Sequence, residues 1–198
     1  MHTSLQQNVF FVKEHVGLFK VASNYDVYHP ESRELLIECR EPNIGFFTKL
    51  FRILGYKVMT PFNIEVRATD GTLITRITRG TVFFRSVVEV FDEKEQLIGK
   101  FRQRMLSLGG KFDVLDANDQ VICTLKGKWA SWEFSFMKDN AELAKVTKKW
   151  AGLGKEMFTT ADNYALEINP AVGKDSQLRT LILAAVLCID MVLKENNG

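Results

Sequence analysis

The chain of 198 residues contains few cysteines and few prolines. The cysteines Cys39, Cys123 and Cys188 are odd in number and far apart. This excludes a disulfide framework and is typical of a reducing compartment, where thiols serve as small apolar residues. Hydrophobic residues make up 46% of the chain and prolines number only four, so the composition excludes a disordered or fibrous protein. We expect one globular domain over residues 1–198.

The chain also lacks a large excess of charge of either sign. Its 26 Lys and Arg residues stand against 24 Asp and Glu residues, which gives a formal net charge of +2. This balance excludes a nucleic-acid-binding protein that holds many phosphates. Any basic binding surface must therefore be local.

No segment matches a signal peptide or a membrane span. Residues 1–10 lack the order of basic region, apolar run and small-residue cleavage site that a secretory signal has. The longest apolar run, Leu181–Leu193, is interrupted by Asp190. As a helix it would reach about 20 Å, against about 30 Å for the hydrocarbon core of a bilayer. We expect a cytoplasmic protein whose contact with a membrane, if any, is peripheral.

Motifs of common enzyme and cofactor sites are missing as well. The sequence has no nucleophile elbow, Walker loop or dinucleotide fingerprint, and Gly109-Gly110 is typical of a turn. The histidines His2, His15 and His29 have no Cys or His at a metal-ligand spacing. We predict a protein that is not an enzyme, with no catalytic residue, no cofactor and no metal ligand.

Alternating apolar and polar residues are abundant. Over residues 62–80 the alternation breaks once, at Asp70-Gly71, which predicts a β-hairpin. The same pattern recurs over residues 112–127, about 48 to 50 positions later, and more weakly over residues 25–37. These copies indicate a repeated hairpin unit.

Further strands are predicted between these copies, over residues 82–91, 97–108, 129–137 and 143–150. No linker rich in Pro, Ser or Gly divides them. Many evenly spaced antiparallel strands favour a mainly β protein that closes into a barrel or a sandwich.

Two segments break the strand pattern. Residues 46–56 place apolar side chains on one arc and Thr48, Lys49 and Arg52 opposite, which predicts a short amphipathic helix. Residues 176–194 predict a helix that is apolar on almost every side. Such a helix must lie in a core or a membrane, and this one is short for a membrane. We therefore predict an antiparallel barrel closed around a buried hydrophobic C-terminal helix.

Asp190 is the one charged residue inside the apolar run of that helix. A buried carboxylate requires a partner such as a Lys or Arg of the barrel. We interpret Asp190 as a paired carboxylate near the barrel mouth, and the alternative is a polar switch or an ion site.

The C-terminal part of the chain resembles a known family. The motif residues are Val146, Lys148, Trp150, Gly152, Lys155, Glu156, Phe158, Thr159, Ala161, Asp162 and Tyr164, followed by the apolar helix. Together with residues 97–100 and Gln103, they resemble the phospholipid scramblase and LURP-one-related family of the tubby-like superfamily, over about residues 20–195. The resemblance implies a closed barrel of about twelve antiparallel strands around a hydrophobic C-terminal helix.

The chain departs from that family in two respects. Animal members carry a proline-rich N-terminal extension and a palmitoylated cysteine cluster, which this chain lacks, so we expect no lipid anchor. Members proposed to bind calcium carry clustered acidic residues after the motif, and Thr160 stands in place of one. Asp162, Asn163, Glu167 and Asp175 could supply only some of the about six to eight oxygen ligands that Ca²⁺ takes. We name no metal ligand among them.

The local charge map gives a functional clue of its own. Residues 40–85 contain eight basic and three acidic residues, a net charge of +5. Near a membrane each such charge contributes about 1 kcal/mol, and the helix predicted over residues 46–56 adds apolar side chains for the interface. We predict peripheral binding of anionic phospholipid headgroups through Lys49, Arg52 and Lys57. The structural alternative is a helix that plugs the barrel end beside strand faces that are only solvated.

Two other functions stay open. A soluble protein-interaction or regulatory scaffold needs only a barrel that presents loops, and its protein partner is not identified by the sequence. A true phospholipid scramblase, which moves lipid between leaflets, is the third hypothesis. We rank it last, because a barrel that buries its long apolar helix offers no polar path across a bilayer.

Overall fold

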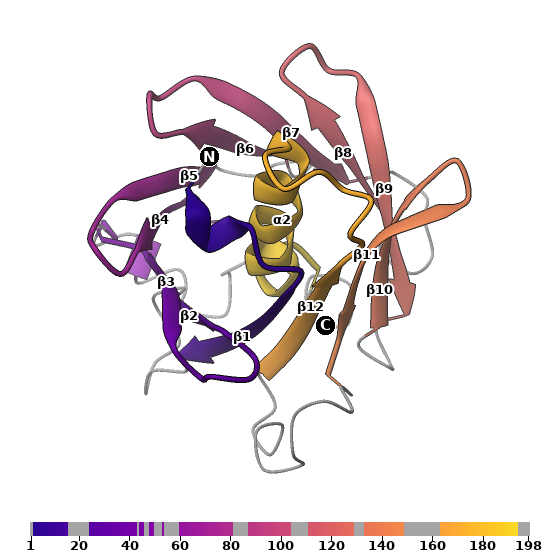
Figure 1. Cartoon of the computed structure of the whole chain (residues 1–198). Helices are drawn as coiled ribbons and strands as arrows, with labels where there is room; N and C mark the ends of the chain where they lie inside the picture. Colours follow the sequence, from indigo (N-terminus) through magenta and orange to yellow (C-terminus); the bar gives the residue numbers. More distant parts are fainter. Residues whose placement is uncertain are drawn as a thin grey trace.

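The structure is a computed structural model that describes most of the chain as one closed barrel (Figure 1). The described residues are 2–15, 24–42, 44–45, 48–49, 53, 60–80, 87–103, 111–128, 133–148 and 163–193. The elements are η1 (Thr3–Leu5), β1 (Val9–His15), β2 (Asn24–Tyr28), β3 (Leu35–Arg40), β4 (Phe62–Ala68), β5 (Leu73–Arg79), β6 (Val87–Asp92), β7 (Leu97–Gln103), β8 (Phe112–Asp116), β9 (Val121–Lys128), β10 (Glu133–Lys138), β11 (Ala141–Thr147), β12 (Asn163–Ile168) and α2 (Gln177–Leu193).

The barrel is antiparallel throughout, and each strand pairs with its neighbours in sequence. It closes where β1 pairs with β12, in a register that runs from Val9 opposite Glu167 to Lys13 opposite Asn163. Closure leaves no unpaired edge. The prediction of a mainly β, twelve-stranded closed barrel is confirmed.

The predicted hairpins are confirmed as β2–β3, β4–β5 and β8–β9. A further copy, β6–β7, lies between the last two, so three successive turns over residues 68–72, 92–96 and 116–120 follow one another every 24 residues. In each turn the first residue donates its N–H to the carbonyl of the fifth. The fourth residue, Gly71, Glu95 or Asp119, has a positive φ of 87°, 60° or 62°.

Strands β1 and β12 and the short helix η1 have no counterpart among the predicted elements. In β12 the first four residues, Asn163 to Leu166, are all buried, and in β1 residues 10–12 are buried in succession. Strands buried on both faces carry no alternation of polar and apolar residues. Periodicity alone therefore does not reveal the two strands that close the barrel.

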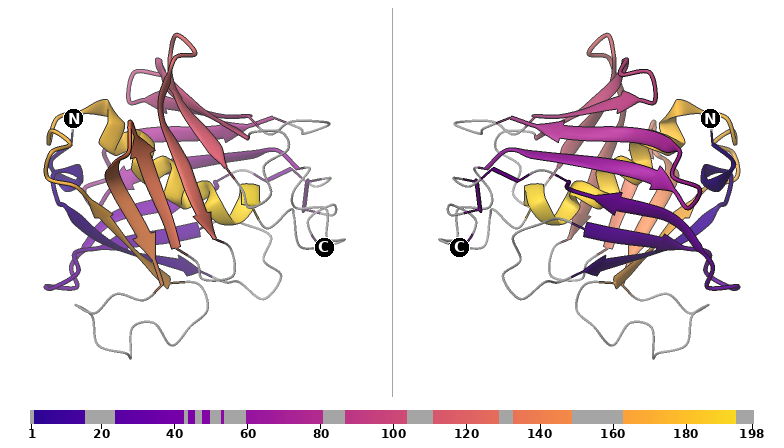
Figure 2. Two further views of the ribbon diagram at one scale, coloured as in Figure 1. Left: turned by 90° about the vertical axis from the view of Figure 1, so that its right-hand side faces the viewer. Right: turned by 90° about the vertical axis from the view of Figure 1, so that its left-hand side faces the viewer.

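The two ends of the barrel are built differently (Figure 2). At the end that we call the turn end lie η1, the five tight hairpin turns and the segment over residues 169–176, which leads into α2. At the opposite end, the loop end, β1, β3, β5, β7, β9 and β11 finish, and longer connections follow all of them except β9. Helix α2 starts at the turn end and runs toward the loop end.

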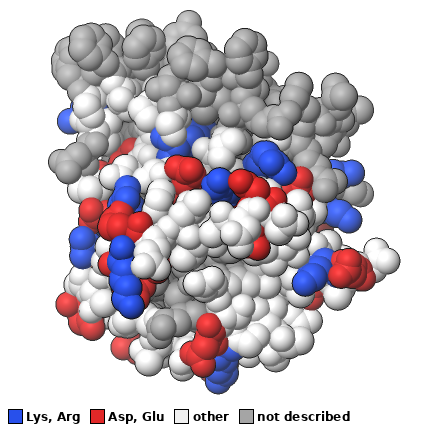
Figure 3. Space-filling model, turned by 90° about the horizontal axis from the view of Figure 1, so that it is seen from above, with Lys and Arg blue, Asp and Glu red and all other residues white. Residues whose placement is uncertain are grey.

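Strand side chains alternate between the lumen and the outer wall. In β4, Phe62, Ile64, Val66 and Ala68 are all buried, whereas the residues between them are half-buried. On the side of the barrel that Figure 3 shows, basic and acidic side chains lie interleaved on the wall. The outer wall is thus polar, and the lumen is apolar.

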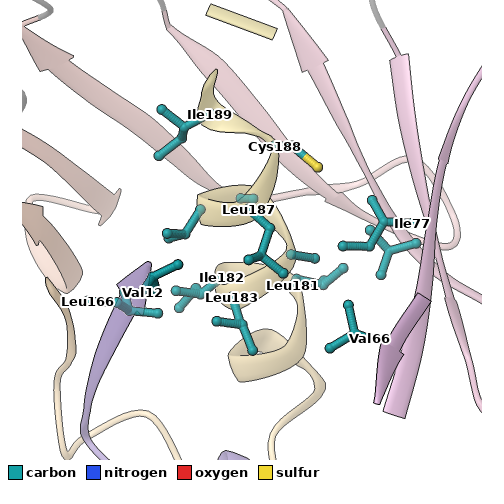
Figure 4. Packing of buried hydrophobic residues seen from close by; sticks show 14 of the residues in the cluster. Val12, Val66, Ile77, Leu166, Leu181, Ile182, Leu183, Leu187, Cys188 and Ile189 are labelled. Atoms are coloured by element: carbon teal, nitrogen blue, oxygen red, sulfur yellow. The ribbon is translucent and has the colours of Figure 1, made fainter. Parts of the chain in front are cut away.

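Helix α2 fills the lumen, as predicted. All nine residues over 181–189 are at most 7% exposed, so the barrel supplies the apolar surroundings that a helix without a wet face requires. In Figure 4, Val12 and Leu166 lie on one side of the helix, and Val66 and Ile77 lie on the other. The side chain of Asp190 lies outside the described part of the chain, so its predicted partner is untested.

The three cysteines are free and buried in this core, as their interpretation as small apolar residues predicts. Burial raises the pKa of Cys123 and of Cys188 to about 12 and raises that of Cys39 as well. Because the thiolate is the reactive form, these three side chains are inert in the folded protein.

Only part of the predicted amphipathic helix over residues 46–56 is described. Thr48, Lys49 and Ile53 have helical backbone, and the Lys49 N–H donates to the carbonyl of Gly45 at 3.0 Å. Ile53, which the pattern places on the apolar arc, is 58% exposed. The other residues of the predicted helix lie outside the described part.

Candidate functional site

Charge is divided unequally between the two ends of the barrel. The sequence segments that connect strands at the loop end contain ten basic and three acidic residues. The turn end contains three basic and eight acidic residues. The strands and α2 sum to zero. The whole-molecule charge of +2 therefore combines a loop end of +7 with a turn end of −5.

Each of the five hairpin turns contributes one net negative charge to the turn end. At the loop end, each connection is neutral or positive, and the connections after β3 and β7 carry +2 each. In the sequence, the difference is thus divided among several connections at each end. A charge distribution of this form orients a protein in the field of a charged surface.

Two cations on the barrel wall between the ends are already paired. Arg76 on β5 donates to the Glu95 carboxylate from Nε at 3.0 Å and from a terminal nitrogen, and its guanidinium lies 4.8 Å from the centre of the Phe91 ring. Twenty-four residues later the same arrangement recurs, because Lys100 on β7 lies 3.0 Å from Asp119. The two ion pairs, Arg76 with Glu95 and Lys100 with Asp119, thus recur at the same 24-residue interval as the hairpin turns.

The other described arginines of the charge map are also engaged. Arg67 pairs with Glu65 at 2.8 Å. Arg79 lies inside the barrel, 3% exposed, where it donates to the Thr60 carbonyl and stacks on the Phe62 ring at 4.8 Å. Strand arginines therefore add little to a headgroup site, because their charges are already neutralised or enclosed.

A cluster around Asp26 occupies the loop-end part of the outer wall on β1, β2 and β3. The Asp26 carboxylate contacts His15 Nε2 at 2.6 Å, accepts from Arg40 at 2.7 Å and accepts from the Tyr28 hydroxyl at 3.0 Å. Arg40 also contacts Glu38 at 2.7 Å. The Asp26 side chain is 9% exposed.

Two opposing effects act on the pKa of Asp26. Burial acts to raise it, because burial disfavours the charged form. Hydrogen bonds from His15, Arg40 and Tyr28 outweigh burial, so the pKa of Asp26 lies below its usual range. Asp26 is therefore an ionised structural carboxylate, and Arg40 is committed to it.

The structure describes one of the three predicted lipid-binding residues. Lys49 is exposed and lies in the connection between β3 and β4 at the loop end. Arg52 and Lys57 belong to the same connection in the sequence and lie outside the described residues. The site of Lys49, Arg52 and Lys57 stays a prediction.

Arg179 in the first turn of α2 is a residue that the sequence analysis missed. It is fully buried and donates to the carbonyls of Leu5, Val172 and Gln7 and to the Asn8 side chain. Burial lowers its pKa. A cation near a helix N-terminus is unfavourable, because it lies at the positive end of the helix dipole. An arginine at the start of the predicted C-terminal helix was therefore a sequence signal of a special role. Through these hydrogen bonds, Arg179 holds the N-terminal segment against the start of α2 at the turn end.

No group of three metal-binding side chains forms within the part of the chain that the structure describes. The calcium candidates lie apart: Asn163 begins β12 at the loop end, whereas Asp175 precedes α2 at the turn end. Asp162 lies outside the described residues. Among the described helices, none combines the length and apolarity of a membrane span.

Comparison with known proteins identifies relatives of this chain. Phospholipid scramblase 1 of Homo sapiens is 26% identical over 78 residues, which are 39% of this chain and 24% of the human protein. The protein of the same name from Mus musculus matches at 26% identity over 78 residues, 39% of this chain and 23% of the mouse protein. The match thus spans about a quarter of the length of these relatives.

A solved structure supports the fold. The X-ray structure of a protein from Arabidopsis thaliana superposes with a TM-score of 0.56, covering 93% of this chain and 91% of that one, at 13% sequence identity. The family model named Scramblase matches residues 7–196. The prediction of the family from the C-terminal motif and the terminal helix is confirmed, and the chain belongs to the Scramblase family.

Proposed function

We propose that this protein binds the surface of anionic phospholipid membranes peripherally, without catalysing a reaction, and that it does so through the loop end of the barrel. Lys49, Arg52 and Lys57 are the residues to which we assign the first contact. The names of the relatives refer to phospholipid, which favours a lipid as the ligand.

The observation that carries the proposal is the separation of charge between +7 at the loop end and −5 at the turn end. An anionic membrane attracts the first and repels the second, so the protein approaches with the loop end forward. Each Lys or Arg near the surface contributes about 1 kcal/mol. Within residues 40–85 the described strand arginines Arg40, Arg67, Arg76 and Arg79 are paired or buried. We therefore assign headgroup contact in this segment to the connection between β3 and β4.

Vesicle flotation tests the proposal. The purified protein is mixed with neutral or anionic vesicles at low and at high salt. We expect flotation with anionic vesicles only, weakened by salt, because salt screens exposed charges. The variant Lys49→Glu/Arg52→Glu should bind at least about thirtyfold more weakly, which corresponds to about 2 kcal/mol for two lost attractions.

The matched control is Lys94→Glu/Lys174→Glu, which makes the same change of charge at the turn end. Both lysines are exposed, so both double variants should keep the wild-type melting temperature. Equal loss of flotation in the two variants would contradict a loop-end site. Undiminished binding of Lys49→Glu/Arg52→Glu would contradict the assignment of Lys49 and Arg52 to the lipid contact.

Absence of flotation at every lipid composition would contradict the proposed binding and would favour the alternative function, a protein-interaction scaffold. Lipid transfer between leaflets is a separate activity, which a dye-reduction assay in reconstituted vesicles detects. Movement above that of empty vesicles would add scrambling to the proposed binding.

A further inference from the structure

The turn end contains a cavity of about 490 Å³ that the proposed membrane contact does not use. It lies between η1, the β4–β5 and β6–β7 hairpins and the start of α2. Leu5, Ile74 and Ile98 line it with apolar side chains that are 1%, 6% and 7% exposed. The volume is in the range of cavities that hold small organic ligands.

The charged side chains that line this cavity are acidic and come from separate elements. Asp92 and Glu93 belong to the β6–β7 hairpin, and Asp175 belongs to the segment before α2. One oxygen of Asp92 accepts from the N–H groups of Lys94 and Gln96. One oxygen of Asp175 accepts from the Gln6 side chain at 3.4 Å. The carboxylates thus line the cavity from two sides.

Thr180 provides a polar group of another kind. It lines the cavity from the first turns of α2 and is only 7% exposed. Its hydroxyl makes no hydrogen bond to any other residue in the described part of the chain. The hydroxyl oxygen itself keeps some exposure, so a polar group of a ligand in the cavity can replace water as its partner.

His2 lines the cavity, and the exposed Lys94 and Lys174 adjoin Glu93 and Asp175 in the chain, whereas Arg179 and the N-terminus of α2 are already hydrogen-bonded. All the hydrogen bonds of Arg179 go to the N-terminal segment and to Val172. The N-terminus of α2 is capped by Ser176, whose hydroxyl accepts from the Leu178 N–H at 3.2 Å and whose carbonyl accepts from the Arg179 N–H. The lining itself contains three carboxylates and one histidine, so it favours a cation over an anion.

We propose that this cavity binds a small organic ammonium ion with a short alkyl arm. The ammonium group pairs with the carboxylates of Glu93 and Asp175 at the cavity mouth, and the alkyl arm packs on Leu5, Ile74 and Ile98. A polar group on the ligand pairs with the Thr180 hydroxyl. The site is independent of the loop end, so it can be tested without lipid.

The test is an NMR titration of the full chain with 4-aminobutan-1-ol in its ammonium form, compared with butyrate and with 1-butanol at equal concentrations. We expect saturable shifts of the amides of Ile74, Ile98 and Thr180 with the aminoalcohol alone. Glu93→Gln and Asp175→Asn should each weaken binding by about tenfold, the usual effect of losing a hydrogen bond to a charged group. Thr180→Val should weaken it less.

The control is Glu31→Gln, which removes an exposed carboxylate of the β2–β3 turn at the same end but outside the cavity. It should leave the affinity unchanged. Equal binding of butyrate or 1-butanol, or equal weakening by Glu31→Gln, would overturn the proposal, and so would the absence of saturable shifts. Each of these results is independent of vesicle flotation.

Discussion

Asp26 illustrates how single residues on the outer wall are committed to structure. Its carboxylate contacts His15 and accepts hydrogen bonds from Arg40 and Tyr28, and the side chain is almost completely buried. In the sequence Arg40 counts as one of eight basic residues that favour an anionic partner. In the structure Arg40 forms ion pairs with Asp26 and Glu38.

We predict that Asp26→Asn destabilises the protein by about 2 kcal/mol at pH 7, because it removes hydrogen bonds to a charged group. The pKa of Asp26 is lower in the folded state than its usual value. Ionised Asp26 therefore stabilises the fold above the unfolded pKa of about 3.9, and this contribution fades as pH falls through the folded pKa. Urea unfolding at several pH values measures it.

The control for this variant is Asp139→Asn in the β10–β11 turn. Asp139 is exposed and has a φ of 47°, a conformation that Asn also tolerates. It should change stability by less than about 0.5 kcal/mol. A destabilisation by Asp26→Asn that is as large at pH 2.5 as at pH 7 would contradict the assignment.

Residue roles were the hardest to predict from the sequence. Charge counts found the basic segment that contains Lys49, but they do not reveal which cations face carboxylates across strands. The pairing of Arg76 with Glu95 depends on strand register. The burial of Arg79 and Arg179 depends on closure of the barrel and on the position of α2.

At the scale of elements, the hairpins were predictable because their turns follow a local rule. Asp92 and Asp116 each accept two backbone N–H groups from their own turns, a pattern typical of aspartate in turns. The same rule does not extend to β1 and β12. They pair across most of the chain, and no local signal encodes that contact.

The contact between β7 and α2 leads to a second prediction. A Cβ atom on Gly99 would lie 2.4 Å from the Leu115 carbonyl and 2.8 Å from a methyl group of Leu181. Gly99→Ala should therefore displace the helix or the strand and destabilise the fold by about 2 kcal/mol, as overpacking commonly does. Thermal and urea unfolding measure the loss.

Gly80→Ala is the matched substitution. A Cβ atom there would meet no atom within 4 Å, so we expect the same or slightly higher stability. If Gly99→Ala were as stable as Gly80→Ala, the close approach of α2 to β7 would be disproved.

At the scale of the whole molecule, the charge difference between the ends predicts an orientation on the membrane. We expect an environment-sensitive fluorophore on Ile53→Cys at the loop end to shift to shorter wavelength with anionic vesicles. The same fluorophore on Ala117→Cys, in the β8–β9 turn, should not shift. Both positions are exposed, whereas the native thiols are buried with raised pKa values and stay unlabelled.

Fluorescence spectra at low salt, with and without vesicles, make this measurement. Neutral vesicles should shift neither probe. A shift of the Ala117→Cys probe equal to that of Ile53→Cys would mean that the barrel binds sideways or by both ends.

The position of α2 in the lumen also determines the order in which this protein can fold. The inner faces of β1 to β12 bury their apolar side chains against a helix that follows all of them in the chain. Strand β1 also cannot pair with β12 until the chain has been synthesised past Glu167, which lies opposite Val9. Nascent chains shorter than about residue 189 therefore expose apolar strands, and we expect them to depend on chaperones that shield such surfaces until synthesis has passed the helix.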